Sequence, residues 1–354
     1  MKERTFMGRT RIAIIGAGII GQTHIKTALN DPACELVAIA DPMPEAENVA
    51  RQYGISYYAD HIEMLDKVKP QGVINATPNK LHMPIGIDCI ERGIPVIVEK
   101  PVAESIASAK KLVQASADKG VPVMVGHHRR HNPIVVKARE VVQSGRLGKI
   151  LAVTAMYKTC KPADYFDIAW RRQPGSGPVL LNMVHDLDML RFVVGEIDSV
   201  QAILSNKSRG FEVEDTAVVC LHFKNDALGT ITLSDNVAAP WNWDMNSRDN
   251  PRFTQLPENC FMIAGTEASL AIPQMDLWYY IGKKGWNQQM VSERIQIVLS
   301  DPFANQLRNL CDVIHGKAQP VLPASDAIHT LAVTEAVFEA ARIGKAINPS
   351  DLLK

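Results

Sequence analysis

The chain has 354 residues, 46% of them hydrophobic, and its 38 Lys and Arg residues balance its 38 Asp and Glu residues. This length suits about two globular domains, and the balanced charge argues against a nucleic-acid or membrane partner, so we expect a small-molecule substrate. The first ten residues lack the apolar core of a signal peptide, and no apolar run reaches the roughly 20 residues of a membrane span. The six cysteines form no CxxC pair, which argues against disulfides or a zinc ribbon and predicts a cytoplasmic protein with free thiols: Cys34, Cys89, Cys160, Cys220, Cys260 and Cys311.

Short β-branched runs alternate with helical segments from Arg11 to about Val125. The runs are RIAIIGAG, CELVAIAD, GVINATP, PVIVEKP and PVMVGH. This alternation predicts a parallel, doubly wound Rossmann sheet, in which ligands bind beyond the carboxyl ends of the strands. We therefore expect a nucleotide-binding domain over residues 1–126 and a substrate-binding and oligomerisation domain over residues 127–354.

The glycine-rich sequence GAGIIG follows the first run and opens a predicted helix. Its first glycine permits a tight turn, its second lets the backbone approach a pyrophosphate, and its third lets helix and strand pack closely. Asp41 ends the second run twenty residues later, where a carboxylate can bind an adenosine ribose hydroxyl, and no Arg or Lys adjoins it. The pattern predicts NAD rather than NADP, bound by Gly16, Gly18, Ile19, Ile20, Gly21 and Asp41.

Two further motifs end strands at the same predicted sheet edge. ATPNKLH supplies Thr77 and Asn79, which can donate to ribose or phosphate, although both are also ordinary turn and cap residues. GluLysPro at 99–101 places Lys100 at the mouth of the crevice, where its ammonium can bind a substrate hydroxyl or carbonyl and move protons. A strand-ending lysine taken alone is usually a solvated surface residue.

The segment HHRRH could place His127 and His131 on one helix face as metal ligands. The two arginines between them would repel a cation, and Pro133 interrupts a helix there. We therefore expect no metal site.

From about Ile150 the runs ILAVTAMY, VQAILSN, TAVVCLHF and LGTITLSD predict an α+β domain with a large, open, mainly antiparallel sheet. A final helix is predicted to start at Ser325 and stop at Gly344. The segment YKTCKPADYFDIAWRR combines donors and flat rings that suit a polyhydroxylated or carboxylated ligand, or alternatively form a polar surface loop. Its candidate substrate ligands are Lys158, Lys161 and Tyr165.

LLNMVHDLDML, residues 180–190, has helical spacing and gathers Asn182, His185 and Asp186 within one arc. Any half-buried helix shows such an arc, so the spacing alone does not distinguish an active-site wall from a solvent-facing side.

Several motifs together resemble the Gfo/Idh/MocA family, over nearly the whole chain: GAGIIG, Asp41, ATPN with His82, EKP, VGHHRRHNP, WR at 170–171 and GSGPVLLNMVHDLDMLRFVVG. The resemblance implies an NAD(P)-dependent oxidoreductase that transfers a hydride to or from a secondary hydroxyl or ketone of a sugar, polyol or sugar acid. It also implies a homodimer or homotetramer formed through the sheet of the second domain. It places Lys100 and His185 at the reacting hydroxyl, His128 and Arg129 in the cleft, and His82, Glu99, Trp170 and Arg171 near the cofactor.

This sequence departs from the family pattern one helical turn before His185. The family usually has an aspartate there, whereas this chain has Leu181, which can neither accept a proton nor orient an imidazole. The predicted chemistry therefore rests on Lys100 and His185, with Asn182 as a neutral substrate ligand and Asp186 or Asp188 as candidate partners of the imidazole.

Two other functions fit the same motifs. One is oxidation of a carbocyclic or cis-dihydrodiol carboxylate, whose acid group Arg129, Arg130, Arg171 and Arg172 would bind. The other is a non-catalytic NAD-sensing regulator, which the missing aspartate would suit and the retained EKP and His185 oppose.

Overall fold

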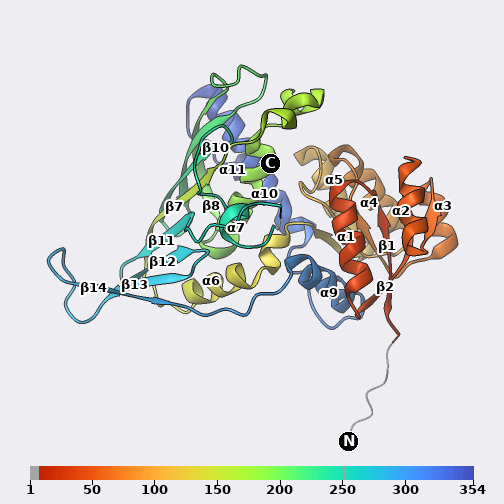
Figure 1. The fold of residues 1–354 in the computed structure, drawn as a ribbon, viewed down its shortest axis with the longest axis horizontal. Helices are drawn as coiled ribbons and strands as arrows, with labels where there is room; N and C mark the ends of the chain where they lie inside the picture. The colour runs from red at the N-terminus through yellow and green to blue at the C-terminus, as the bar shows by residue number, and fades with distance from the viewer. Residues whose placement is uncertain (1–7, 251) are drawn as a thin grey trace, which may run out of the picture. The chain divides into compact units, whose positions relative to one another are not determined.

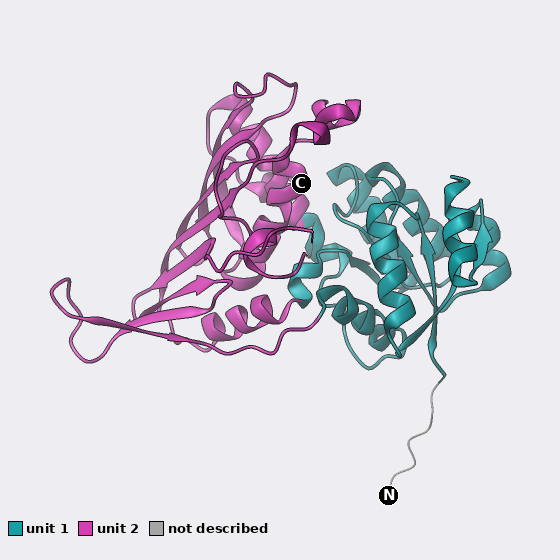
Figure 2. Cartoon of the chain, in the orientation of Figure 1, with its two compact units in different colours: residues 1–131, 301–328 teal, residues 132–300, 329–354 magenta. Residues whose placement is uncertain are grey.

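The chain folds into two compact units in this computed structural model, which describes residues 8–250 and 252–354 (Figure 2). Unit 1 comprises Met1–His131 and Asp301–Ile328, and unit 2 comprises Asn132–Ser300 and His329–Lys354. The prediction that the chain begins without a signal peptide concerns residues 1–10, most of which lie outside the described part of the chain. The sequence predicted two continuous domains. Unit 1 is instead discontinuous, because it also includes residues 301–328.

Unit 1 is built on a parallel sheet with the strand order β3-β2-β1-β4-β5-β6 (Figure 1). Its strands are β1 (Thr10–Ile15), β2 (Cys34–Ala40), β3 (Ser56–Tyr58), β4 (Gly72–Asn75), β5 (Val96–Val98) and β6 (Val123–Val125). Its helices are α1 (Ile19–Asn30), α2 (Glu45–Tyr53), α3 (His61–Val68), α4 (His82–Glu91), α5 (Ile106–Lys119) and α9 (Pro302–Ile314). The predicted Rossmann sheet is confirmed, with β3 as an additional edge strand of three residues, too short for a periodic signal.

The returning segment joins unit 1 through the apolar face of α9. Leu307, Leu310 and Cys311 are buried in the same core as Ile12 and Ile74 of the central strands. The helix starts at the N-cap Asp301, whose carboxylate accepts the Phe303 N–H at 2.8 Å. Burial of this face explains why 301–328 belong to unit 1, which no local signal in the sequence indicated.

Backbone hydrogen bonds continue between neighbouring chain segments just beyond the strand ends of unit 1. The Gly16 N–H donates to Ala40 O at 2.8 Å, Ala76 N–H to Ile15 O at 2.7 Å, and Glu99 N–H to Asn75 O at 2.9 Å. The loops after β1, β2, β4 and β5 therefore lie side by side at one edge, as the parallel order requires.

Unit 2 contains an eight-stranded sheet with the order β14-β13-β12-β11-β7-β10-β9-β8. Its strands are β7 (Ile150–Lys158), β8 (Ile197–Ser205), β9 (Thr216–Phe223), β10 (Leu228–Ser234), β11 (Phe261–Gly265), β12 (Ala268–Ile272), β13 (Asp276–Tyr280) and β14 (Met290–Arg294). Its helices are α6 (Pro133–Gln143), α7 (Val184–Val193), α8 (Trp243–Asn246), α11 (Pro349–Leu352) and most of α10 (Ala324–Ile343). Among the described strands of this sheet only β10 and β7 pair in parallel, so the predicted open, mainly antiparallel sheet is confirmed.

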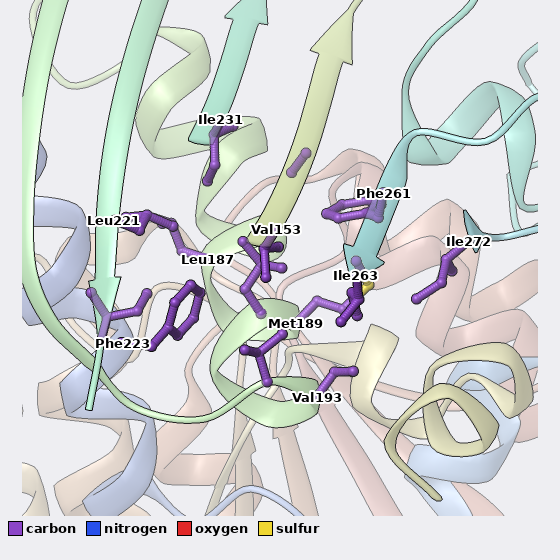
Figure 3. Close-up of a cluster of buried hydrophobic side chains, with 14 of the residues drawn as sticks. Val153, Leu187, Met189, Val193, Leu221, Phe223, Ile231, Phe261, Ile263 and Ile272 are labelled. Carbon is purple, nitrogen blue, oxygen red and sulfur yellow. The ribbon is translucent and has the colours of Figure 1, made fainter. Parts of the chain in front are cut away.

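One face of this sheet is covered by helices and forms the larger core. Figure 3 shows Leu187, Met189 and Val193 of α7 close to Val153 of β7 and Ile263 of β11. These apolar residues hold α7, and with it His185, on the inner face of the sheet.

No helix in the described part of the chain is both long enough and apolar enough to cross a membrane.

Candidate active site

The glycine loop of unit 1 has the form that a dinucleotide phosphate requires. Gly16 has φ +94° and a Cβ there would lie 2.6 Å from Ala76 O, so a side chain is excluded. A Cβ at Gly18 would meet no atom of the chain within 4 Å, and the first turn of α1 contains no acidic residue. Because the first N–H groups of a helix lack partners within it, this open helix end fits an anionic pyrophosphate.

Asp41 lies at the end of β2 beside the glycine loop. Its carboxylate accepts the Ala17 N–H at 2.7 Å and the Met43 N–H at 2.8 Å. A carboxylate has about four acceptor positions, so two main-chain bonds leave capacity for a ribose hydroxyl. Glu45 and Glu47 follow in the first turn of α2, and their charges oppose a 2′-phosphate.

The loop after β4 holds Thr77 and His82 in different ways. Thr77 Oγ1 donates to Asn75 Oδ1 at 2.6 Å, which fixes its hydroxyl at the sheet edge. The His82 ring is buried, with its nitrogens 2.8 Å from Thr77 O and 2.7 Å from Pro101 O. His82 therefore ties two edge loops together, while Asn79 opens the short helical turn Asn79–Leu81 and is half-buried.

Lys100 is half-buried at the end of β5, and the glutamate before it is buried in a polar cluster. Glu99 Oε2 accepts the Lys100 N–H at 3.1 Å, and His24 Nε2 donates to Glu99 Oε1 over 2.8 Å. Burial alone would raise the pKa of Glu99, but the hydrogen bond and charge of His24, with the charges of Lys100 and His128, lower it to about 2. Glu99 is thus an anion that supports the Lys100 main chain.

The residues after β6 pack against the returning segment. The His128 ring stacks on Phe303 with 4.4 Å between centroids, and burial, with the charge of Arg129, lowers the pKa of His128 to about 3. Arg129 is buried, and Arg130 forms an ion pair with Asp326 at 2.9 Å. Among the described residues, no cluster of His, Cys, Asp and Glu could hold a metal ion.

The helix that carries His185 is not uniform. A π-helical segment, Val179–Met183, precedes α7 and contains Leu181 and Asn182, both half-buried like His185. Such segments often mark functional positions in helices. Asp186 and Asp188 are each 1% exposed, so they do not belong to a solvent-facing polar arc. Asp188 accepts a hydrogen bond from Thr330 at 2.8 Å, an engagement with α10 that the sequence pattern did not indicate.

Charged side chains from outside this helix hold the amide of Asn182. Lys161 Nζ donates to Asn182 Oδ1 at 3.1 Å and lies 3.0 Å from Asp235 Oδ2. Asp235 is 2% exposed and also pairs with Arg209. Burial lowers the pKa of Lys161, although the charge and hydrogen bond of Asp235 oppose that effect.

Aromatic side chains cover this network. Lys161 Nζ lies 5.0 Å and Arg171 Cζ 4.1 Å from the centroid of the Tyr165 ring, in cation–π geometry. Trp170 is largely exposed, with Arg171 5.6 Å from its ring. The structure thus brings together Lys161, Tyr165 and Asn182, three of the predicted substrate ligands.

Lys158 is separated from this group by the alternation of β7. Val153, Ala155 and Tyr157 point into the core beneath α7, whereas Lys158 Nζ lies over the Trp241 ring at 5.5 Å. Because successive strand residues point to opposite faces, Lys158 lies on the sheet face away from α7.

The sequence reasoning missed four residues of these clusters. His24 follows the third glycine by three residues, which puts it on the same face of α1, and Asp235 ends the run LGTITLSD as Asp41 ends its own. Both signals could have been used. Arg209 and Phe303 had none, because each reaches its cluster from a distant segment.

Family models match most of the chain. The model described as "Oxidoreductase family, NAD-binding Rossmann fold" (Gfo/Idh/MocA) matches residues 10–127, and the Gfo/Idh/MocA C-terminal domain matches residues 135–271. The first region is therefore an NAD-binding Rossmann domain, and NAD is the cofactor.

Curated relatives include several polyol dehydrogenases. The rhizopine catabolism protein MocA of Rhizobium meliloti is 29% identical over 54% of this chain and 59% of its own length. The scyllo-inositol 2-dehydrogenase (NAD(+)) of Bacillus subtilis is 25% identical over 96% of both chains. Levoglucosan dehydrogenase of Pseudarthrobacter phenanthrenivorans is 29% identical over 65% of this chain and 68% of its own.

Solved structures share the fold over nearly the whole chain. An oxidoreductase from Agrobacterium radiobacter, in complex with NAD+, L-tartaric acid and magnesium, has a TM-score of 0.83 at 19% identity and covers 98% of this chain and 100% of its own. The WlbA dehydrogenase from Bordetella pertussis, in complex with NADH and UDP-GlcNAcA, has a TM-score of 0.75 at 24% identity, covering 96% and 99%. At these identities the likeness concerns the fold alone.

Proposed function

The chain belongs to the Gfo/Idh/MocA family of NAD-dependent oxidoreductases acting on CH–OH groups, and from that premise we propose that it oxidises, or reversibly forms, a secondary hydroxyl of a sugar, polyol or sugar acid. The Lys161–Asn182–Asp235 network carries this proposal. It holds the amide of Asn182, three residues before His185 in the chain, next to charged hydrogen-bonding groups, which suits a polyhydroxylated substrate.

Lys100 and His185 are proposed to handle the proton of the reacting hydroxyl. NAD supplies the hydride acceptor when it is bound. Because Lys161 donates to Asn182 Oδ1, the amide Nδ2 group of Asn182 can donate to a substrate oxygen. Asn182 and Lys161 thus take the substrate-holding part that an aspartate at position 181 would share, and a neutral imidazole or amine removes the proton.

The cofactor contacts are proposed at the carboxyl edge of the unit 1 sheet. The turn of α1 and the open point at Gly18 would receive the pyrophosphate, and Asp41 the adenosine ribose. Thr77 and Asn79 would serve the adjacent phosphate or ribose, with Trp170 and Arg171 nearer the nicotinamide. The acidic start of α2 supports NAD over NADP.

Initial rates of NADH formation, followed by absorbance with a panel of inositols, sugar acids and dihydrodiols, test this function. We expect one polyol or sugar acid to turn over, and Lys100→Met and His185→Asn each to lower kcat/KM by about 100-fold or more. Lys111→Met, on the exposed surface of α5, is the matched control. Wild-type kcat/KM in either active-site variant would refute the assignment of that residue.

Oxidation of a dihydrodiol carboxylate has less support, because two of the arginines expected to bind its acid group already have partners within the chain. Arg130 is paired with Asp326, and Arg171 donates to Tyr165 O at 2.8 Å and lies over two rings. Preferred turnover of a cis-dihydrodiol carboxylate in the same panel would nevertheless select this alternative.

We also propose that a second copy of the chain covers the outer sheet face of unit 2. Ile203, Val218, Leu228 and Trp278 are exposed there, on β8, β9, β10 and β13. The pairing register aligns Ile203 with Val218 and then with Thr232 and Met156, a row without a formal charge. An uncharged row across four strands of an exposed sheet face is typical of an oligomer interface.

Sedimentation equilibrium tests the oligomer. The wild type is expected as a dimer or tetramer, and Val218→Asp is expected to shift it toward the monomer because an unpaired carboxylate would be buried in the interface. Ile281→Asp, which also replaces an exposed apolar residue but lies beyond β13, is the control. A monomeric wild type at micromolar concentration would contradict the proposal.

We propose a cytoplasmic location because the cysteines are free thiols. All six cysteines are free, and burial raises the pKa of Cys34 and of Cys89 to about 12, so both stay protonated and unreactive. Equal activity with and without a reductant such as dithiothreitol is expected, and fractionation of cells would test the compartment directly.

A further inference from the structure

A buried acid–imidazole pair lies directly behind Lys100 in unit 1. His24, from the inner face of α1, is 2% exposed and its Nε2 donates to Glu99 Oε1 over 2.8 Å. The second carboxylate oxygen, Oε2, accepts the Lys100 N–H at 3.1 Å. One carboxylate therefore links the first helix of the fold to the main chain of the proposed proton-handling lysine.

The Glu99 carboxylate is buried and closely surrounded. A Cβ at Gly126 would lie 2.7 Å from Glu99 Oε1 and 2.8 Å from its Cδ, so the loop after β6 touches the carboxylate. Phe303 of α9 packs against the imidazole of the pair, with its ring edge-on to His24 at 5.4 Å and 81° and stacked on His128. Segments following β1, β5 and β6, together with α9, thus enclose the pair.

A buried carboxylate is costly to desolvate even when it is hydrogen-bonded, and replacing such a polar cluster with apolar residues is often neutral or stabilising, so stability alone gives little reason for its presence. A hydrogen bond from the next residue's N–H to the carboxylate instead fixes a main-chain position. An anion beside an amine also favours its protonated form. Both effects act on Lys100.

We propose that His24 and Glu99 are positioning residues for Lys100: His24 orients the Glu99 carboxylate, which fixes the Lys100 main chain and sets the charge next to its amine. This inference rests on the proposed function, in which Lys100 acts at the reacting hydroxyl. The low pKa of Glu99, about 2, keeps the carboxylate ionised at neutral pH. Among the described residues, His128 after β6 also acts electrostatically on Glu99, and His127 and Arg129 act in turn on His128.

The test compares Glu99→Gln, His24→Leu and His24→Gln, the last of which keeps an N–H donor. We expect Glu99→Gln and His24→Leu to lower kcat at its high-pH plateau by about ten-fold or more, a tenth of the lower range for a lost proton-transfer group. His24→Gln should stay within about three-fold of wild type, and the double variant that combines His24→Leu with Glu99→Gln should fall no further than either single variant. The NAD dissociation constant, from quenching of tryptophan fluorescence, should change less than about three-fold in all of them.

The pH profile separates positioning from general support of the fold. Without the Glu99 anion, the amine of Lys100 loses its proton at a lower pH, so the rise of kcat with pH should shift downward in Glu99→Gln. An unchanged kcat and profile in Glu99→Gln would overturn the proposal. So would equal losses in His24→Gln and His24→Leu. If Glu99→Gln does not fold, the comparison of the two His24 variants decides.

Lys100→Met in the same assay distinguishes failure of this inference from failure of the proposed function. Full activity in Lys100→Met would refute the role of Lys100 itself. Activity lost in Lys100→Met but intact in Glu99→Gln would overturn only the positioning pair.

Discussion

Asp235→Asn removes the charge at the centre of the network that fixes Asn182. The carboxylate is 2% exposed and holds both Lys161, at 3.0 Å, and Arg209, whose side chains are 12% and 11% exposed. Removing one partner of a buried ion pair costs about 3–5 kcal/mol, because the remaining charge is left uncompensated. Domains are stable by only about 5–15 kcal/mol, so this is a large fraction of the total.

The expected result is a fall in the melting temperature of about 6–20 °C, since 1 kcal/mol corresponds to about 2–4 °C in a unit of this size. Thermal unfolding followed by circular dichroism measures it, with the exposed Asp164→Asn as the matched control. Lys161→Met combined with Asp235→Asn should lose less than the sum of the single variants. At 25 °C, Asp235→Asn should also raise the KM of the substrate, because Lys161 no longer holds Asn182 in place. A melting temperature within about 1 °C of wild type would refute the reasoning that this pair is buried and coupled.

Four further outcomes are expected from other contacts in the two units. Asp41→Asn should weaken NAD binding by about 10–150-fold through loss of a hydrogen bond to a charged acceptor, measured by fluorescence titration, and equal weakening of NADP would contradict the ribose assignment. The pKa of Glu99 is about 2 in the folded chain against 4.5 for the free group, so its ionised form stabilises the fold above about pH 4.5. This contribution is lost as the pH falls toward 2. In urea unfolding, the free energy of unfolding of the wild type should therefore fall by about 3 kcal/mol more across that pH range than that of Glu99→Gln. Gly126→Ala should cost about 1–3 kcal/mol in urea unfolding, because its Cβ would lie 2.7 Å from Glu99 Oε1, and an unchanged midpoint would mean that the loop yields freely. Arg191→Met should cost about 3–5 kcal/mol, because it takes the cation away from Asp188, which lies 4.0 Å from Arg191 and is 1% exposed, and removes the hydrogen bond that Arg191 donates to Thr330 at 2.7 Å. It should leave kcat/KM unchanged at 25 °C; a loss of kcat/KM without a loss of stability would argue against a structural role.

The sequence predicted those residues of the candidate site that follow the ends of strands in unit 1. In a parallel sheet all carboxyl ends share one edge, so the glycine loop, Asp41, Thr77 and Lys100 could be brought together from sequence order alone. Asp235 follows the end of β10 in unit 2, but its approach to Lys161 depends on the parallel pairing of β10 with β7, which the predicted antiparallel sheet did not indicate.

The sequence by itself determined the two sheets, the cofactor motif and the position of His185 on a helix, because strand periodicity, glycine spacing and helical spacing are local properties of the chain. Only the tertiary structure decided what surrounds these groups. Phe303 reaches unit 1 from a segment about 170 residues beyond the rest of that unit, and Lys158 and Lys161, three residues apart, have different environments because the strand ends between them. Likewise, the replacement of an aspartate by Leu181 could be read from the sequence, but not the fact that Lys161 and Asp235 fix the neighbouring Asn182. Those contacts join segments far apart in the chain, and burial of the apolar faces of α7 and β10 in one core is what brings them within hydrogen-bonding distance.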